Sequence, residues 1–516
     1  MWKKQKVLTL FFFIILVFPI VVLASESLYS KDSVEVQLLG VNDLHGQLNT
    51  PLTYKGEKVG GISYLTSYLQ EYEQKNPNTL LVHAGDMIGG SPPISSLFQD
   101  EPAVKWMNYV DFDVGTLGNH EFDEGVPEMQ RMLKGGYHED TGYFTGSTTP
   151  YTTANVIDKQ SGSSLLPPYI IKEVHGVKIG FIGVVTTDTK DYVLSENLQN
   201  VEITDEVKAI NKAVAELKEK NINSIVVLGH VAAKSNKNGQ NPGREFVDMA
   251  SEIDDEVDVM FAGHNHTYAN TEVDGKLIVQ AYSYGKAFSK VDLTIDPTTQ
   301  EITNIESNII YTYHKGMTPD NQTELLLKKY DDQLKYEYKD VIANTDHNIA
   351  KKPNKNGESP LAQLISRSLK EEMDADIGFV HHGGIRTNVS AGPVRPIDFH
   401  TVLPFKHNGI VLSMTGEEIK SVLMAQWSGE KENILQFSGM TYDWKKSAKG
   451  VEVSDLKDQQ NHAIEPTKHY EVAVTHYLAN GGDGFKEFAA GDVLREGPEL
   501  VDIVINYVKK NGLENR

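Results

Sequence analysis

The sequence predicts a layered α/β protein in which a larger N-terminal domain precedes a smaller C-terminal one. Short apolar stretches alternate with helical patterns through the N-terminal half, which is the sequence signature of stacked strands and helices. Polar and glycine residues follow several of the apolar stretches, where open α/β sheets place their ligands. A second run of helices and strands extends from Leu361 to about Val508.

The composition fits a globular protein with several domains. The chain has 516 residues, of which 40% are apolar and 23% charged, so disorder and a polytopic membrane protein are poor fits. The absence of Cys excludes disulfides, a thiolate zinc site and a cysteine nucleophile. The net charge of −22 opposes sequence-blind binding of a nucleic-acid polymer, but a local metal site could still hold a small phosphate.

The N-terminus has the pattern of a secretory signal peptide. Three lysines among the first six residues precede an apolar run from Val7 to Ala24, and Val22-Leu23-Ala24 offers short residues for cleavage. We expect residues 1–24 to direct export and cleavage to follow Ala24, which places the mature chain outside the cytoplasm. The alternative is an uncleaved N-terminal anchor. We expect no other membrane contact, because no second apolar run approaches this length.

Strands and helices are expected in alternation along the first domain. The apolar stretches predict strands at 34–41, 80–83, 114–117, 177–185, 224–228 and 257–261. Apolar residues at helical spacing predict helices at 62–72, 94–109 and 205–220.

A polar segment is expected to join the two domains. Residues 318–338 have helical spacing with four leucines, which indicates a connecting helix, and residues 351–358 read as a loop. We therefore predict a first domain at 34–315, a linker at 316–345 and a second domain at 346–510.

Five polar motifs follow predicted strands of the first domain. Because strands of one sheet deliver such residues to a common edge, we expect their side chains to meet. The motifs are Asp43-Leu44-His45, Gly85-Asp86, Gly118-Asn119-His120-Glu121-Phe122-Asp123, Gly229-His230 and Gly263-His264-Asn265-His266.

These residue types suit two divalent metal ions. A pair of ions roughly 3.5–4 Å apart can clamp a phosphoryl group and activate water, and imidazole with carboxylate suits Mn, Zn, Co or Fe. Asp86 is expected to bridge the two ions. One ion is assigned to Asp43, His45 and His266, and the other to Asn119, His230 and His264.

The motif that contains Asn119 also offers a catalytic pair. His120 is left free to contact phosphate and protonate the leaving oxygen, and Asp123, three residues on, is placed to orient its imidazole. A lone Gly-His such as Gly229-His230 is more often structural, but all five motifs in this order favour a metal site.

The motif set resembles the calcineurin-like metallophosphoesterase superfamily. The motif order, Gly-Asn-His-Glu-Phe-Asp and the chain length are similar to the secreted 5′-nucleotidase family, which includes ecto-5′-nucleotidases and periplasmic UDP-sugar hydrolases. That resemblance implies a four-layer α/β/β/α metallophosphoesterase sandwich followed by a separate, smaller α/β nucleotide-binding domain. It also implies that the small domain rotates on the connecting segment.

Three segments of the C-terminal domain match the same family. By that match Arg386, in His382-Gly383-Gly384-Ile385-Arg386, resembles the phosphate-binding arginine. Phe405 and Tyr477 look like the pair of rings that stacks on the base, and Asp483 looks like the carboxylate that contacts the ribose.

The chain departs from the family pattern in this domain at three positions. His382 stands where Asn is usual, and Tyr477 stands where Phe is common. In the loop where relatives carry another phosphate-binding arginine, this chain has Lys355. A lysine ammonium is a point charge, whereas an arginine guanidinium is a planar fork of N–H donors. These changes leave the preferred phosphate ester open.

The resemblance predicts a 5′-nucleotidase that releases nucleoside and phosphate. A 2′,3′-cyclic phosphodiesterase with 3′-nucleotidase activity and a UDP-sugar hydrolase remain alternatives on the same scaffold. A silent surface-binding protein is a distant alternative, because Asp86, Asn119 and His120 are all present. The expected partner is a nucleotide and not a nucleic-acid polymer; the sequence leaves the oligomeric state open.

Overall fold

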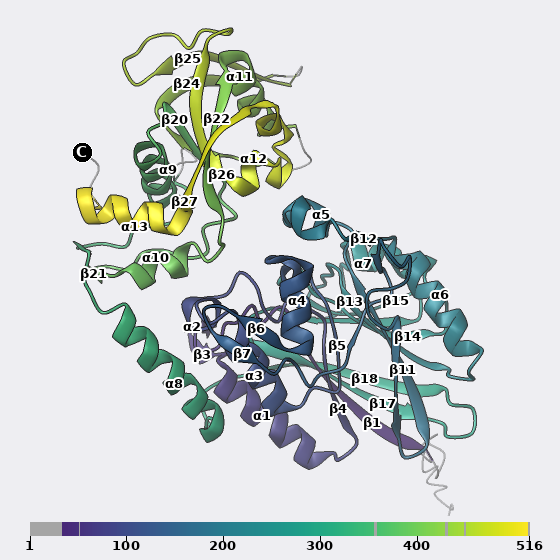
Figure 1. Cartoon of the computed structure of the whole chain (residues 1–516). Coiled ribbons are helices and arrows are strands. Elements are labelled where there is room, and N and C mark those ends of the chain that lie inside the picture. The colour runs from purple at the N-terminus through teal and green to yellow at the C-terminus, as the bar shows by residue number, and fades with distance from the viewer. Residues whose placement is uncertain (1–32, 51, 355–358, 429–431, 448–449, 514–516) are drawn as a thin grey trace, which may run out of the picture.

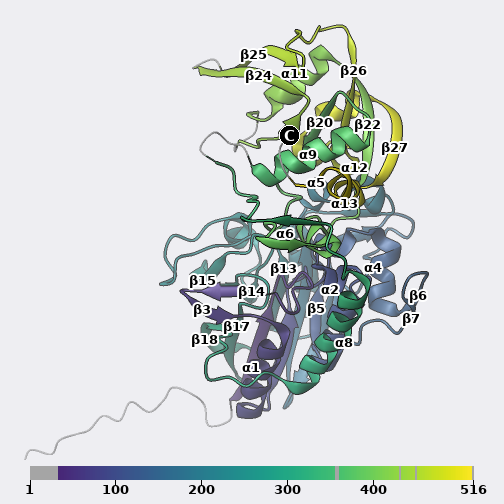
Figure 2. The ribbon, with the colours of Figure 1, turned by 90° about the vertical axis from the view of Figure 1, so that its left-hand side faces the viewer.

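The computed structural model describes residues 33–50, 52–354, 359–428, 432–447 and 450–513. It consists of two lobes, with the C-terminal lobe stacked on the N-terminal lobe in both views (Figures 1 and 2). The expected signal peptide and Lys355 lie outside the described residues. Within the described residues, no helix combines the length and apolarity needed to cross a membrane.

Two six-stranded sheets form the centre of the N-terminal lobe. The first has the order β18-β17-β1-β4-β5-β8 and the second β10-β11-β13-β14-β16-β15. The first contains β1 (Val34–Val41), β4 (Thr79–His83), β5 (Val114–Thr116), β8 (Tyr151–Thr152), β17 (Ala287–Ile295) and β18 (Ile302–Tyr311). The second contains β10 (Tyr169–Val174), β11 (Val177–Val185), β13 (Ser224–His230), β14 (Val257–Phe261), β15 (Tyr268–Val273) and β16 (Lys276–Ala281).

Alternating side chains of β1 explain the four layers. Val36 and Leu38 pack against residues of the second sheet, whereas Leu39 and Val41 pack against helices on the outer face. All four side chains are buried, so β1 lies between two apolar layers. This confirms the expected α/β/β/α sandwich.

The helices between residues 62 and 248 are α1 (Ile62–Lys75), α2 (Pro93–Ser96), α3 (Glu101–Val110), α4 (Gly125–Lys134), α5 (Thr189–Tyr192), α6 (Glu206–Lys218) and α7 (Glu245–Asp248). Residues of α1, α2 and α3 pack in the apolar core on the outer face of the first sheet, and residues of α6 and α7 pack on that of the second. The single helix expected at 94–109 was wrong, because the chain breaks into α2 and α3. Gln99 and Asp100 adopt left-handed backbone conformations between them, with φ of 53° and 56°, which a continuous helix excludes.

The polar helix expected near 318–338 is α8 (Asn321–Glu337), capped by the Asp320 side chain. Its Leu327, Tyr330 and Leu334 are buried in the core of the N-terminal lobe. The helix therefore packs as part of that lobe (Figure 2).

The C-terminal lobe is built on one five-stranded sheet of order β23-β20-β26-β22-β27. Its strands are β20 (Ile377–Val380), β22 (Asn408–Thr415), β23 (Gln436–Ser438), β26 (His469–Thr475) and β27 (Asp492–Glu499). Apolar cores fill both faces. The helices are α9 (Pro360–Glu372), α10 (Pro396–Val402), α11 (Gly416–Ala425), α12 (His476–Ala479) and α13 (Leu500–Asn511).

Short two-stranded ribbons and 3₁₀ turns complete both lobes. The ribbons pair β2 (Leu52–Tyr54) with β3 (Glu57–Val59), β6 (Gly136–His138) with β7 (Gly142–Phe144), β9 (Val156–Asp158) with β12 (Val201–Ile203), β19 (Ala343–Thr345) with β21 (Gly392–Val394), and β24 (Met440–Ser447) with β25 (Gly450–Asp458). The 3₁₀ turns are His120–Phe122, Ser195–Leu198, Met249–Glu252, Gly482–Gly484 and Lys486–Ala490.

Candidate active site

Strand ends of both sheets carry the candidate metal ligands. β1, β4 and β5 run parallel in the first sheet, and β13 and β14 run parallel in the second, so their carboxyl ends point the same way within each sheet. The loops after these strands bring the expected residues together. They are Asp43 and His45 after β1, Asp86 after β4, Asn119 and His120 after β5, His230 at the end of β13, and His264 and His266 after β14.

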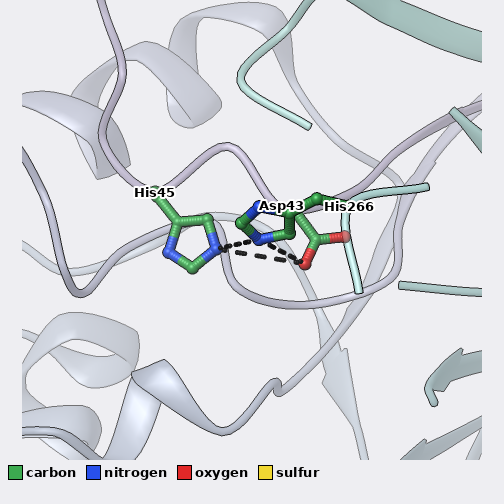
Figure 3. Close-up of side chains that lie close together, drawn as sticks. All are labelled: Asp43, His45 and His266. Carbon is green, nitrogen blue, oxygen red and sulfur yellow. Dashed lines mark hydrogen bonds and ion pairs between the residues drawn. The ribbon is translucent and has the colours of Figure 1, made fainter. Parts of the chain in front are cut away.

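Asp43, His45 and His266 form the first group of candidate ligand atoms, and Figure 3 shows the side chains of the loop after β1 meeting that of His266. The two Nε2 atoms of His45 and His266 lie 3.0 Å apart. The His266 Nε2 is 3.4 Å from Asp43 Oδ1, and the His45 Nε2 is 3.9 Å from the same oxygen. These distances allow all three atoms to contact one cation.

Asn119, His230 and His264 form the second group. Asn119 Oδ1 lies 3.1 Å from His230 Nε2 and 2.9 Å from His264 Nδ1. Asp86 Oδ2 is 3.1 Å from His230 Nε2 and 3.5 Å from His45 Nε2. One carboxylate oxygen thus faces both groups, as a bridging ligand requires.

Hydrogen bonds fix the orientation of two candidate ligand imidazoles. His45 Nδ1 donates to the Gly89 carbonyl oxygen at 2.9 Å, and His230 Nδ1 donates to the Ala84 carbonyl oxygen at 2.8 Å. Each Nε2 is thereby turned toward the other candidate ligand atoms, and that of His230 faces two acceptor oxygens, Asn119 Oδ1 and Asp86 Oδ2. Burial lowers the pKa of His230, but the carboxylates of Asp86 and Asp43 outweigh burial and raise the pKa to about 9, so a proton occupies this nitrogen when no metal is bound. A divalent ion can replace that proton, because imidazole, amide and carboxylate groups are suitable ligands, so the residues fit two divalent ions.

Most of these residues adopt an unusual backbone conformation. Five of the seven candidate ligands have positive φ: Asp43 (50°), His45 (50°), Asp86 (50°), His264 (78°) and His266 (56°). A left-handed conformation costs a non-glycine residue roughly 1–2 kcal/mol. Such strain collects at functional sites, where it turns side chains toward a common point.

The carboxylate of Asp43 is held by its neighbours. The Asn42 Nδ2 donates to Asp43 Oδ2 at 2.6 Å, and the backbone N–H of His264 donates to Asp43 Oδ1 at 2.9 Å. Burial raises the pKa of Asp43 to about 7, although the charge of His230 opposes the shift. Because burial disfavours its ionised form, this carboxylate is stabilised strongly by a nearby positive charge such as a metal ion.

His120 and Asp123 form the expected pair beside the ligand groups. His120 Nδ1 donates to Asp123 Oδ2 at 2.7 Å, so its Nε2 is left for the cavity. Burial lowers the pKa of His120, but the carboxylates of Asp123 and Asp86 outweigh burial and raise the pKa to about 9. The imidazole is therefore charged at neutral pH.

Glu121 is a residue that the sequence reasoning missed. Its carboxylate accepts the backbone N–H groups of Asp86 at 3.0 Å, Met87 at 2.8 Å and Gly118 at 2.5 Å. It thereby ties the loop after β4 to the loop after β5. The position of Glu121 between His120 and Asp123 could have indicated a role in the site. The sequence does not show, however, which backbone N–H groups donate to its carboxylate.

The expected substrate residues of the C-terminal lobe line the same cavity, of about 380 Å³, as Asp86, Asn119 and His120. They are Arg386, Phe405, Tyr477 and Asp483. The Tyr477 hydroxyl lies 3.1 Å from Asp483 Oδ1 and accepts the Asp483 backbone N–H at 2.9 Å.

Arg386 reaches the N-terminal lobe. Its Nη2 donates to the Tyr284 hydroxyl at 3.3 Å, and the Tyr284 ring meets the edges of His45 and His266 at 5.8 Å and 5.2 Å between centroids. Tyr284 is a second residue missed in the sequence, where it appears only as one of many tyrosines. Through its hydroxyl, Tyr284 holds the Arg386 guanidinium on the side of the cavity where the candidate metal ligands lie.

The stacking rings have two further members. Phe405 stacks on His407 at 5.6 Å between ring centroids, and His407 stacks on Tyr477 at 5.4 Å. On its other side Phe405 lies 5.9 Å from the ring of His120. One of the rings expected to stack on the base, Phe405, therefore lies beside the expected catalytic residue His120.

Both parts of the chain match known families. Residues 36–268 match the family model described as calcineurin-like phosphoesterase, and residues 341–490 match the model described as 5′-nucleotidase, C-terminal domain. The chain is 33% identical over 530 residues to the cell wall protein Lmo0130 of Listeria monocytogenes, which covers 93% of this chain and 68% of that protein.

The chain belongs to the 5′-nucleotidase family. A second family relative is Endonuclease YhcR of Bacillus subtilis, 38% identical over 491 residues. The match covers 93% of this chain but spans only 40% of that relative's length. The fold is that of the 5′-nucleotidase precursor from Thermus thermophilus, with a TM-score of 0.74, 23% identity and coverage of 92% and 96% of the two chains. Members of this family are metal-dependent phosphoester hydrolases.

Proposed function

We propose that this chain hydrolyses nucleotide phosphate esters, with 5′-nucleotidase activity that yields a nucleoside and phosphate. The observation that carries the proposal is the single cavity that Asp86, Asn119, His120, Arg386 and the stacking rings all line. Candidate metal ligands come from one lobe and candidate nucleotide-binding groups from the other. A phosphate ester with a flat base fits that combination of chemistry.

Each group has a defined part in the proposed reaction. Two divalent cations, when bound, stabilise charge on the phosphoryl oxygens and activate water. His120 holds a proton on Nε2, and we propose that it passes this proton to the leaving oxygen while Asp123 fixes the ring through Nδ1. Arg386 binds the phosphate through its planar fork of N–H donors.

The C-terminal lobe supplies the rest of the substrate contacts. Phe405 and Tyr477 stack on the base, and Asp483, which is fixed by the Tyr477 hydroxyl, accepts hydrogen bonds from the ribose. We also propose that the protein acts outside the cytoplasm, supported by the apolar run from Val7 to Ala24 and by the relative named as a cell wall protein.

Phosphate release from a substrate panel tests the proposal. The mature chain, stripped with EDTA and resupplied with Mn²⁺, Zn²⁺, Co²⁺ or Mg²⁺, is given 5′-AMP, 3′-AMP, 2′,3′-cyclic AMP, ADP and UDP-glucose. A phosphatase added afterwards reveals esters released by diesterase action. We expect metal-dependent release from 5′-AMP that His120→Ala removes. No release from any member of the panel by the metal-loaded chain would contradict the proposal.

Phosphodiester cleavage is the second candidate. It is favoured by the 38% identity to a protein named as an endonuclease, although this chain spans only 40% of that protein. Activity on the cyclic ester alone would move the assignment to a cyclic phosphodiesterase. Activity on UDP-glucose with little on 5′-AMP would move it to a nucleotide-sugar hydrolase.

A further inference from the structure

His407 lies in the middle of the stacked rings of the C-terminal lobe. Its ring plane makes an angle of 12° with Phe405 and 4° with Tyr477, so the three rings are almost parallel. Its centroid is 5.6 Å from that of Phe405 and 5.4 Å from that of Tyr477, so it is almost equally distant from the two rings.

The distances show that the imidazole does not cover the centres of its neighbours. Parallel rings in contact are about 3.5 Å apart, so a centroid separation of 5.4–5.6 Å implies a sideways offset of about 4 Å. Offset stacking of this kind leaves part of each neighbouring face free. A base stacked on that free part lies parallel to the imidazole and beside it, and therefore meets it edge to edge.

The ring nitrogens of His407 form no hydrogen bond with any other residue that the structure describes. The side chain lines the same cavity as Arg386 and Asp483. Burial, together with the charges of His381 and His476, lowers the pKa of His407 to about 3. A neutral imidazole offers one N–H donor and one acceptor in its plane.

We propose that His407 recognises the edge of the nucleobase by hydrogen bonds in the plane of the stacked rings. The inference rests on the proposed function, because it assumes that the base enters between Phe405 and Tyr477. Stacking tolerates every base, whereas hydrogen bonds at the edge discriminate between their donor and acceptor patterns. His407 is thus the residue that sets base preference in this cavity.

Nucleoside binding tests the inference without any chemistry on phosphate. Calorimetry on the full mature chain would give dissociation constants for adenosine, guanosine, cytidine and uridine. We expect the wild type to prefer some of these over others. His407→Ala should weaken the best-bound nucleoside about threefold to tenfold, as for one lost hydrogen bond, and narrow the spread among the four.

Two further variants separate edge recognition from a general effect on the fold. His407→Gln keeps an in-plane donor and acceptor and should retain part of the spread. His462→Ala removes an exposed histidine remote from the cavity and should leave all four constants unchanged. The melting temperature of each variant shows that it is folded.

Four results would overturn the inference. The wild type could bind all four nucleosides with equal affinity, or bind none of them. His407→Ala could leave the affinities unchanged, or it could tighten all four uniformly, which would mean that the imidazole competes with the base for the space between Phe405 and Tyr477.

Metal-dependent phosphate release from glycerol 2-phosphate, which has no base, reports the proposed function separately. Release without nucleoside binding defeats only the inference about His407. His407-dependent nucleoside binding without any phosphate release supports the inference and defeats the proposed hydrolysis.

Discussion

At the scale of single residues, the candidate site depends on groups that aim the ligands as much as on the ligands themselves. The Gly89 carbonyl oxygen fixes His45, and the Glu121 carboxylate fixes the backbone of Asp86. Gly89 has φ of 82°, and a Cβ there would lie 2.4 Å from the His120 carbonyl oxygen, so only glycine fits. This gives the glycine-rich loop after β4 a physical role.

Glu121→Gln should disturb the site without removing any candidate ligand. An amide has only one oxygen, so at least one of the three N–H groups that the carboxylate accepts is left facing an NH₂ group. A buried unsatisfied donor costs about 1–3 kcal/mol, and we expect a lower melting temperature and weaker metal binding. Glu219→Gln, at an exposed position, is the matched control. Unchanged stability and metal affinity in Glu121→Gln would refute this role.

Asp123→Asn should lower turnover while substrate binding is largely kept. Asp123 contacts the His120 ring at 2.7 Å and orients it. Loss of such an orienting carboxylate typically costs about 10- to 100-fold in activity. Steady-state kinetics on 5′-AMP should show the loss in kcat with little change in KM. A change confined to KM would instead place Asp123 among the substrate contacts.

At the scale of elements, parallel strands explain why the ligand positions were predictable. The strands expected at 34–41, 177–185 and 257–261 are confirmed residue for residue, because apolar residues dominate each segment and interrupting polar residues such as Glu35, Lys178 and Asp258 are few. Once those strands are placed, the motifs after them are brought to one region. That these motifs meet could therefore be predicted from local pattern alone, whereas their role as metal ligands stays a prediction.

Other features depend on contacts between distant segments and could not be predicted. The break between α2 and α3 follows from left-handed conformations at Gln99 and Asp100, which the apolar spacing does not reveal. Packing of α8 on the N-terminal lobe and the place of His407 in the ring stack depend on how far-apart elements meet. Neither leaves a periodic signal in the sequence.

The pH dependence of stability offers a test within β14. Asp258 is half-buried, and its Oδ2 accepts the Ile225 backbone N–H of neighbouring β13 at 3.1 Å. Burial raises the pKa of Asp258 to about 7 from its ordinary value of 3.8. The folded state therefore binds the proton more tightly than the unfolded state, and stability falls as the pH rises from about 4 to about 7.

Asp258→Asn removes this loss, because the amide keeps an acceptor and does not ionise. The stabilisation relative to wild type should grow by roughly 2–3 kcal/mol, or roughly 5–10 °C in melting temperature, between pH 5 and pH 8. Thermal melts of both proteins at the two pH values give the comparison. A melting difference that does not change with pH would contradict the raised pKa.

At the scale of the whole molecule, the substrate cavity is divided between two lobes, and polar contacts are among those that join them. Lys406 donates to Gln99 Oε1 at 2.6 Å and lies 3.7 Å from Glu124 Oε2, and the Tyr477 hydroxyl lies 3.1 Å from the Asp191 carbonyl oxygen. Because α8 belongs to the N-terminal core, we propose that rotation between the lobes occurs in the short segment 338–341.

Lys406→Glu should loosen the contact between the lobes. The new carboxylate faces Glu124 and replaces an attraction with a repulsion of similar size, worth up to about 1 kcal/mol at a surface pair. We expect KM for 5′-AMP to rise about twofold to fivefold at low salt, with a smaller effect at high salt. Lys446→Glu, which reverses a pair with Glu432 inside the C-terminal lobe, is the control. Equal effects of the two reversals would argue against a specific contact between lobes.

We propose that two metal ions, shared through Asp86, are required for activity. Metal content per chain can be measured by mass spectrometry alongside phosphate release from 5′-AMP, while Mn²⁺ or Zn²⁺ is titrated into the EDTA-stripped protein. Activity should rise to a maximum as two ions per chain bind, and Asp86→Ala should retain fewer ions and no activity. Full activity in the stripped chain, or two bound ions in an active Asp86→Ala variant, would contradict the proposal.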